Sequence, residues 1–136
     1  MKRLLAFIGM LLMGTVQANI VIVAHPSNTN VLSKDDIQRL YTGKMANFAN
    51  GDSAVPLNLS DGNSLRTQFD EKALGRSSSQ VKAYWSKLVF TGKGTPPKEV
   101  ANEAEMLQLV SSNPNILGYV SSSTDFSNLK VLLVLE

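Results

Sequence analysis

The sequence contains no cysteine and only one histidine, His25, among its 136 residues. The absence of cysteine excludes a disulfide framework, thiolate catalysis and a cysteine-based zinc site. With a single histidine, a zinc site would depend almost entirely on carboxylate ligands, so we expect neither a metal nor another cofactor. A domain without disulfides has to be stabilised by its hydrophobic core.

Long apolar runs are also scarce, and the one that stands out begins at Leu4, after two basic residues, and ends at Val16. Val16 and Ala18 then place compact side chains at positions −3 and −1 of an expected cut before Asn19. This is the pattern of a cleavable secretory signal peptide, and the run is shorter than the roughly 20 residues that a membrane span needs. We therefore expect residues 1–18 to be removed on export, which gives a periplasmic or secreted protein. An uncleaved anchor or a buried helix is the alternative.

Dense clusters of basic residues are absent from the remainder, residues 19–136. Because Lys2 and Arg3 leave with the signal peptide, 11 basic residues face 11 acidic ones in the mature chain. The basic isoelectric point of the whole chain, about 9.0, therefore does not indicate a nucleic-acid partner. The mature length suits one domain that does not span the membrane.

Short apolar segments alternate with helix-like segments along residues 19–136. Ser33 with Asp36, and Ser77 with Gln80, have the spacing of helix capping boxes. The expected strands are 19–24, 54–59, 116–120 and 130–135, and the expected helices are 33–41, 64–74, 77–90 and 103–112. This alternation predicts an α/β fold with a mixed β-sheet of about four strands flanked by about four helices.

Three segments carry further structural expectations. The nearly continuous apolar run 19–24 is typical of a strand in a parallel sheet that is covered on both faces. Pro56 has no N–H group to donate, which favours an edge position or the start of a strand. Apolar side chains recur with helical spacing between Val81 and Val89, so we expect Tyr84 and Trp85 to pack in the core.

The turn from Ser60 to Arg66 is the strongest candidate site, because it leads from a strand end into a helix start. Free backbone N–H groups, the Ser64 hydroxyl and the Arg66 guanidinium could together bind an anion. Ligands of open α/β sheets also tend to bind at the carboxyl ends of strands. The alternative is that Asn63 or Ser60 simply caps the helix while Arg66 is solvated.

The loop after the first strand offers further donors, from Ser27 and Asn28, and could form the other wall of one cleft. An ordinary turn stabilised by its own side chains is the alternative. His25 lies beside this loop, but the sequence contains no G-x-S-x-G or comparable motif, so we expect no enzymatic activity. The loop from Thr91 to Pro97 is instead a candidate contact for a protein partner.

The chain resembles the phosphate ABC-transporter substrate-binding family, within the type II periplasmic binding protein superfamily, and is closest to its short, single-domain members. The matching segments, in order, are 32–44, 55–58, 66–69, 83–94 and 113–120. The resemblance implies a single periplasmic-binding-protein-like lobe, export, and binding of phosphate or a similar small oxyanion in connection with ABC-type phosphate transport. By this resemblance, Ser27, Asn28, Ser64 and Arg66 are the candidate ligand-binding residues.

The chain departs from the larger phosphate-binding members at two places. They carry an arginine before the turn and Ser-Gly-Thr at the helix start, whereas this chain has Leu59 and Asn63-Ser64-Leu65. They also close two lobes on the ligand, so one lobe would need a partner or a homodimer to enclose phosphate. The alternative function is an interaction or sensor module that keeps the fold, contacts an envelope or transporter protein, and has lost phosphate binding.

Overall fold

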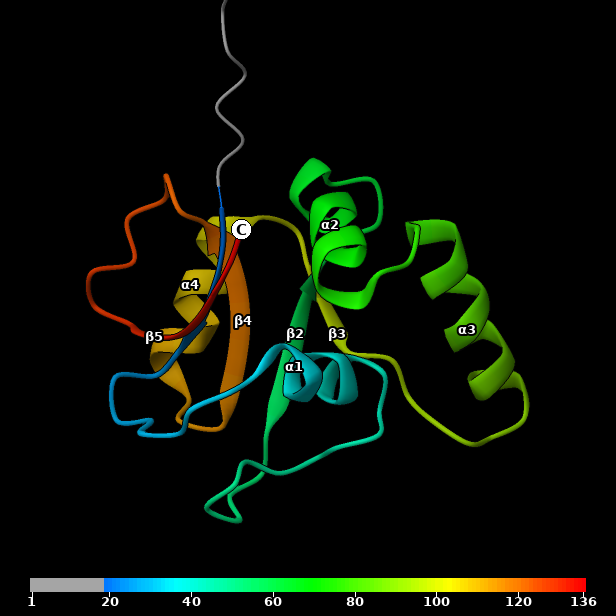
Figure 1. The fold of residues 1–136 in the computed structure, drawn as a ribbon, viewed down its shortest axis with the longest axis horizontal. Coiled ribbons are helices and arrows are strands. Elements are labelled where there is room, and N and C mark those ends of the chain that lie inside the picture. Colours follow the sequence, from blue (N-terminus) through cyan, green and yellow to red (C-terminus); the bar gives the residue numbers. More distant parts are fainter. Residues whose placement is uncertain (1–18) are drawn as a thin grey trace, which may run out of the picture.

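The computed structural model describes residues 19–136, which form one five-stranded β-sheet packed between helices (Figure 1). The expected signal peptide, residues 1–18, lies outside the described residues. The strands are β1 (Ile20–Ala24), β2 (Val55–Leu59), β3 (Lys98–Val100), β4 (Ile116–Ser121) and β5 (Lys130–Leu135). The helices are α1 (Lys34–Tyr41), α2 (Ser64–Phe69), α3 (Ser78–Phe90) and α4 (Glu103–Ser112), and a π-helix, η1 (Asp70–Leu74), continues α2. The predicted α/β class is confirmed, with one strand more than expected.

The strand order is β3-β2-β4-β1-β5, and the sheet is mixed. β2 runs parallel to β3 and β4, whereas β1 runs antiparallel to β4 and β5. β1 is buried along its whole length, as expected, but the expectation of parallel pairing is wrong. Ala24, the last residue of β1, and Pro56, near the start of β2, are both paired with Leu117. The loop after β1 and the turn after β2 therefore lie at opposite ends of the sheet.

Two neighbouring residues of β4 show that helices cover both faces of the sheet. A Cβ atom on Gly118 would collide with Met106 of α4 and lie 3.3 Å from Val110, so this face lies directly against α4. Successive residues of a strand point to opposite faces, and Tyr119 accordingly packs on the other side. Its ring is stacked on Phe69 of α2, with 3.9 Å between the ring centroids. The ring of Tyr41, from α1, meets Phe69 edge-on at 4.7 Å.

β2 lies inside the sheet although it contains Pro56. Pairing with β4 involves Val55 and Pro56, and pairing with β3 begins only at Leu57. The proline thus occupies the start of the strand, before the ladder with β3 begins, which is one of the two positions predicted for it. β3 itself is only three residues long, with two of them exposed, and it therefore lacks the apolar pattern by which strands are recognised.

Local capping signals in the sequence are confirmed. Ser33 and Asp36 form a reciprocal capping box at α1, and Ser77 and Gln80 form another at α3. Asn63 caps α2 by accepting a hydrogen bond from the Leu65 backbone N–H. Within residues 19–136, no helix combines the length and apolar character required to cross a membrane.

α3 lies at the side of the domain, beyond β3 (Figure 1). Trp85 packs α3 against the segment that follows α1. Its indole lies so close to Gly43 that a Cβ atom on Gly43 would approach the indole to 3.0 Å. The Tyr84 hydroxyl also donates a hydrogen bond of 2.6 Å to the Thr42 carbonyl. Trp85 is buried and Tyr84 is half-buried, as predicted. The apolar side chains at the C-terminal end of α3, however, are exposed to solvent. Val89 is 53% exposed and the neighbouring Phe90 is 92% exposed.

Candidate oxyanion-binding cavity

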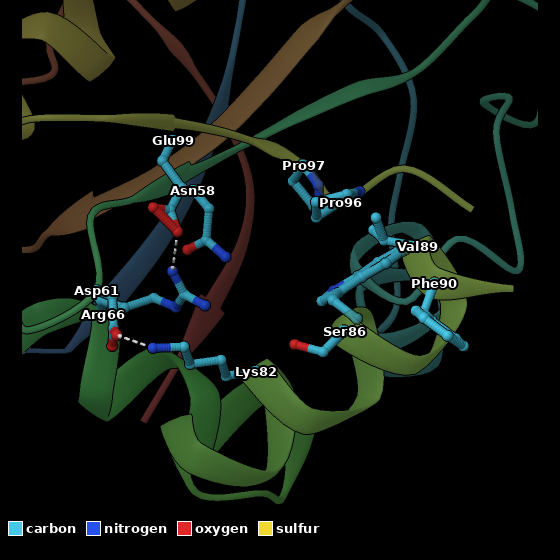
Figure 2. A pocket seen from close by; sticks show the side chains of 11 residues that line it. Asn58, Asp61, Arg66, Lys82, Ser86, Val89, Phe90, Pro96, Pro97 and Glu99 are labelled. Atoms are coloured by element: carbon cyan, nitrogen blue, oxygen red, sulfur yellow. Dashed lines mark hydrogen bonds and ion pairs between the residues drawn. The ribbon is translucent and has the colours of Figure 1, made fainter. Parts of the chain in front are cut away.

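A cavity of about 650 Å³ lies between the β2 end of the sheet and α3 (Figure 2). One side of it is polar and comes mainly from β2, β3 and the turn into α2. The other side is apolar and comes from α3 and from the segment that leads into β3. The lining residues are Asn58, Asp61, Arg66, Lys82, Trp85, Ser86, Val89, Phe90, Pro96, Pro97 and Glu99.

Arg66 forms the centre of the polar side, and most of its guanidinium is held by the protein. Its Nε–H points at the Asp70 carboxylate, 3.0 and 3.2 Å from the two oxygens. Its Nη1 donates to the Leu59 carbonyl at 2.8 Å and to the Glu99 carboxylate at 3.3 Å. Among residues 19–136 no partner is found for Nη2, and this nitrogen points into the cavity (Figure 2). Two N–H donors of a positioned guanidinium are thus available to a ligand.

The ion pair between Arg66 and Asp70 is almost entirely withdrawn from solvent, with side-chain exposures of 7% and 0%. Burial raises the pKa of the Asp70 carboxyl, and a hydrogen bond from the Ser78 hydroxyl together with the Arg66 charge offsets part of this effect. Burial by itself would lower the pKa of Arg66, but Asp70 and the other surrounding groups outweigh it and raise this pKa. Arg66 therefore remains charged.

Asn58 supplies a second set of donors from the middle of the polar side. Its Oδ1 accepts from the Leu59 backbone N–H at 3.0 Å and also from the Tyr119 hydroxyl. Because a backbone N–H can only donate, this contact fixes which end of the amide is oxygen. The Nδ2 group is consequently turned toward the cavity, near the free edge of Arg66 (Figure 2).

Two acidic side chains accompany these donors. Glu99 pairs with Arg66 from β3, and Asp61 lies 3.8 Å from Lys82 Nζ at an exposed position. An exposed pair of this kind contributes little stability, so Lys82 is free to turn toward a ligand. The polar side therefore combines N–H donors with carboxylates, which could accept a hydrogen bond from a protonated oxyanion.

The apolar side of the cavity is built around Trp85, whose ring is held between Gly43 and Gly94. Val89 and Phe90 extend it from α3 toward solvent, and Pro96 and Pro97, from the segment that leads into β3, line the same side of the cavity (Figure 2). Ser86 presents its hydroxyl on the α3 side, between the polar and apolar parts.

Comparison with solved structures shows what this arrangement of elements is similar to. A protein described as a phosphate ABC transporter substrate-binding protein from Clostridium perfringens, with bound phosphate, matches with a TM-score of 0.68 and 21% identity over 85% of this chain. An ABC-type phosphate transport receptor from Vibrio cholerae gives 0.65 and 17%, and PstS from Borrelia burgdorferi gives 0.64 and 9%, each over 85% of this chain. The chain has the fold of a single periplasmic-binding-protein-like lobe.

The lobe covers only 44–46% of the length of those three solved chains. No protein-family model matches the sequence, and no curated protein matches it. The expected resemblance to phosphate substrate-binding proteins is thus confirmed at the level of the fold.

The structure separates the four predicted site residues. Arg66 lines the cavity, and Ser64 lies exposed two residues earlier, at the start of α2, without contributing to the lining. Ser27 and Asn28 follow β1 and lie at the other end of the sheet, so the prediction that both loops wall one cleft is wrong. The cause is the antiparallel course of β1.

The loop after β1 is stabilised by its own side chains. His25 Nδ1 lies 2.7 Å from the Ser27 hydroxyl and 3.1 Å from the Ser27 backbone nitrogen. Asn28 is buried, and its Oδ1 accepts from the backbone and the side-chain nitrogen of Asn30. These are the contacts of an ordinary turn, the alternative stated for this loop.

Sequence reasoning missed four residues of the site, namely Asn58, Asp70, Lys82 and Glu99. Asn58 carried a usable signal, because it is the one polar residue in the strand V-P-L-N-L. Asp70 also carried one, since it lies four residues after Arg66 on the same helical segment. Glu99 carried none, because β3 itself was not expected.

Proposed function

We propose that this chain is a periplasmic substrate-binding-type protein that binds phosphate or a similar small oxyanion in connection with ABC-type phosphate transport. The observation that carries the proposal is the buried guanidinium of Arg66, whose free Nη2 edge points into a cavity beside Asn58. The likeness of the lobe to solved phosphate receptors supports the same ligand class. Export follows from the N-terminal sequence pattern.

The proposed chemistry is recognition by hydrogen bonds. Arg66 and Asn58 donate to the oxyanion, Lys82 approaches from the mouth of the cavity, and the carboxylates of Asp61 or Glu99 accept from a protonated ligand oxygen. Ser64 adds a hydroxyl from the neighbouring helix start if the ligand reaches the turn. The similar solved structures are binding and transport proteins, which fits a non-enzymatic role.

Calorimetric titration of the purified protein with phosphate, and then with sulfate, tests the proposal after dialysis to remove carried-over ligand. Replacing Arg66 by Lys keeps the charge but removes the planar fork, so we expect phosphate affinity to fall about tenfold or more. The matched control is Arg39→Lys, since Arg39 pairs with Asp35 at an exposed position on α1 and does not line the cavity.

Each outcome of this titration has a distinct meaning. A folded protein that gives no heat with either anion would contradict oxyanion binding and direct attention to an interaction or sensor role. Binding that Arg66→Lys and Arg39→Lys leave equally unchanged would place the ligand elsewhere on the lobe. Circular dichroism of each variant establishes that a lost signal does not come from unfolding.

A further inference from the structure

We infer that the oxyanion bound in this cavity is the head group of a larger molecule with an apolar, ring-sized substituent, such as an aryl phosphate monoester. The inference rests on the proposed function and adds the class of molecule that the same site takes. It follows from the size of the cavity, from its division into a polar and an apolar side, and from two exposed apolar residues that line it, Val89 and Phe90.

The size of the cavity favours an organic ligand. Its volume of about 650 Å³ lies in the range of roughly 300–1,000 Å³ that is typical of sites for drug-sized molecules. A free phosphate ion has five heavy atoms and would contact only the polar corner that Arg66 and Asn58 form. The remaining space, toward Phe90 and the two prolines, would then hold only water.

The two sides of the cavity are complementary to the two ends of such a molecule. Arg66 and Asn58 are both more than nine-tenths buried, and each aims into the cavity N–H donors that have no partner among the residues from Asn19 onward. Val89 and Phe90 lie on the opposite side, with Ser86 between the two groups (Figure 2). A phosphoryl group held by the first pair would direct its substituent toward the second.

Phe90 and Val89 do not belong to the hydrophobic core of the part of the chain that the structure describes. Phe90 is 92% exposed at the last position of α3, and Val89 is 53% exposed beside it. Apolar side chains that gather at the rim of a cavity commonly mark a binding surface. Pro96 and Pro97 add rigid apolar surface on the same side of the cavity, because proline has a fixed φ and little side-chain freedom to lose on binding.

The charges of the polar side indicate that contacts to the oxyanion alone are weak. Asp70 and Glu99 already pair with Arg66, and Asp61 pairs with Lys82. Three carboxylates thus accompany two cations, so a doubly charged phosphate meets a polar side with a net charge of −1. Burial of an aromatic substituent against Trp85 and Phe90 would add the affinity that the head group lacks.

Trp85 makes the inference directly measurable, because it is the only tryptophan of the chain and it lines the cavity. Its fluorescence is followed during titration of the full-length protein with inorganic phosphate, phenyl phosphate, glycerol phosphate and phenol. We expect phenyl phosphate to bind at least about tenfold more tightly than inorganic phosphate, since burying a ring contributes this much or more. Glycerol phosphate and phenol should each bind more weakly than phenyl phosphate.

Two variants distinguish the contribution of the apolar side of the cavity to affinity from that of the polar side. Phe90→Ser should lower the affinity for phenyl phosphate severalfold and leave that for inorganic phosphate unchanged, and it should not unfold the protein because Phe90 is exposed. Val31→Ser is the matched control: Val31 is 83% exposed and does not line the cavity, so neither affinity should change. Calorimetry repeats both titrations, so that a ligand without a fluorescence effect is not missed.

The outcomes distinguish this inference from the proposed function. Inorganic phosphate that binds as tightly as phenyl phosphate would overturn the inference and leave oxyanion binding intact. Phenol that binds as tightly as phenyl phosphate, or a Phe90→Ser variant that binds phenyl phosphate like the original protein, would also overturn the inference. Absence of binding by every phosphate compound would overturn both proposals.

Discussion

Arg66 illustrates how a buried charge can be made available to a ligand. Asp70 neutralises it, the Leu59 carbonyl and Glu99 orient it, and only its Nη2 edge remains for the cavity. The Asp70 carboxylate is in turn held by the Ser78 hydroxyl at 2.7 Å. A donor fixed in this way loses little freedom when a ligand binds, which favours affinity.

Replacing Asp70 by Asn is expected to destabilise the fold by about 3 kcal/mol. The amide has almost the same shape, but it leaves the Arg66 charge buried without its counterion, and such a loss costs roughly 3–5 kcal/mol. We expect the lower end of this range, because the Nη2 edge still reaches the cavity. Urea unfolding followed by circular dichroism measures the change.

The double variant Arg66→Met, Asp70→Leu provides the control for this prediction. It removes both charges, and apolar residues of similar size often replace a buried ion pair at little cost. It should therefore be more stable than Asp70→Asn alone, although it can no longer bind an oxyanion through Arg66. A double variant that is as unstable as the single one would show that packing, and not the unpaired charge, causes the loss.

Among the secondary-structure elements, β4 contributes to the packing on both faces of the sheet. Gly118 allows α4 to lie directly on one face of the sheet, and Tyr119 on the other face stacks on Phe69. The Tyr119 hydroxyl also donates to Asn58, so the strand that carries the core contacts also positions a donor of the cavity. The packing of α4 and the geometry of the site are therefore linked through one strand.

Gly118→Ala tests this packing. The added methyl group would collide with Met106 and lie 3.3 Å from Val110, both fully buried in α4, so we expect a loss of about 2 kcal/mol, within the usual cost of overpacking. Thermal or urea unfolding measures it. Combining it with Met106→Ala should cost less than the sum of the two single changes, because each relieves the other. Additive losses would contradict a direct contact.

The elements were predictable where their signals are local. The capping boxes at Ser33 and Ser77 involve residues three apart, and both are present. The direction of β1 could not be read in the same way, because its partners, β4 and β5, lie about a hundred residues further along the chain. An apolar run reports burial on both faces but not whether the neighbouring strands are parallel.

The difference between local signals and contacts between distant segments also explains which parts of the site could be predicted. The turn before Arg66 was recognisable, because a strand end followed by a capped helix is a local pattern. The pairing of Arg66 with Glu99 depends on β3, a strand of three residues without apolar alternation. Ser27 and Asn28 were expected beside Arg66 because they too follow a strand end and because of the family resemblance, but β1 runs antiparallel to β4 whereas β2 runs parallel to it.

For the whole molecule, the decisive feature is that one lobe matches 44–46% of the length of the solved phosphate receptors. The cavity lies within this lobe, between the β2 end of the sheet and α3. A ligand of the proposed kind would therefore lie between a sheet end and a helix of the same domain. The Phe90 variant tests whether the apolar end of α3 contributes to its affinity.

The N-terminal boundary of the lobe leads to the last prediction. β1 begins at Ile20, directly after the expected cut, and the Asn19 backbone nitrogen donates to the Ser122 hydroxyl at 3.0 Å. Cleavage after Ala18 would therefore leave β1 and the contact between Asn19 and Ser122 in place. Mass spectrometry of the exported protein should find Asn19 as the first residue, and Ala18→Arg should cause the uncleaved chain to accumulate, because a large charged side chain replaces the small residue at −1. Exported protein that still begins at Met1 would show an uncleaved anchor instead.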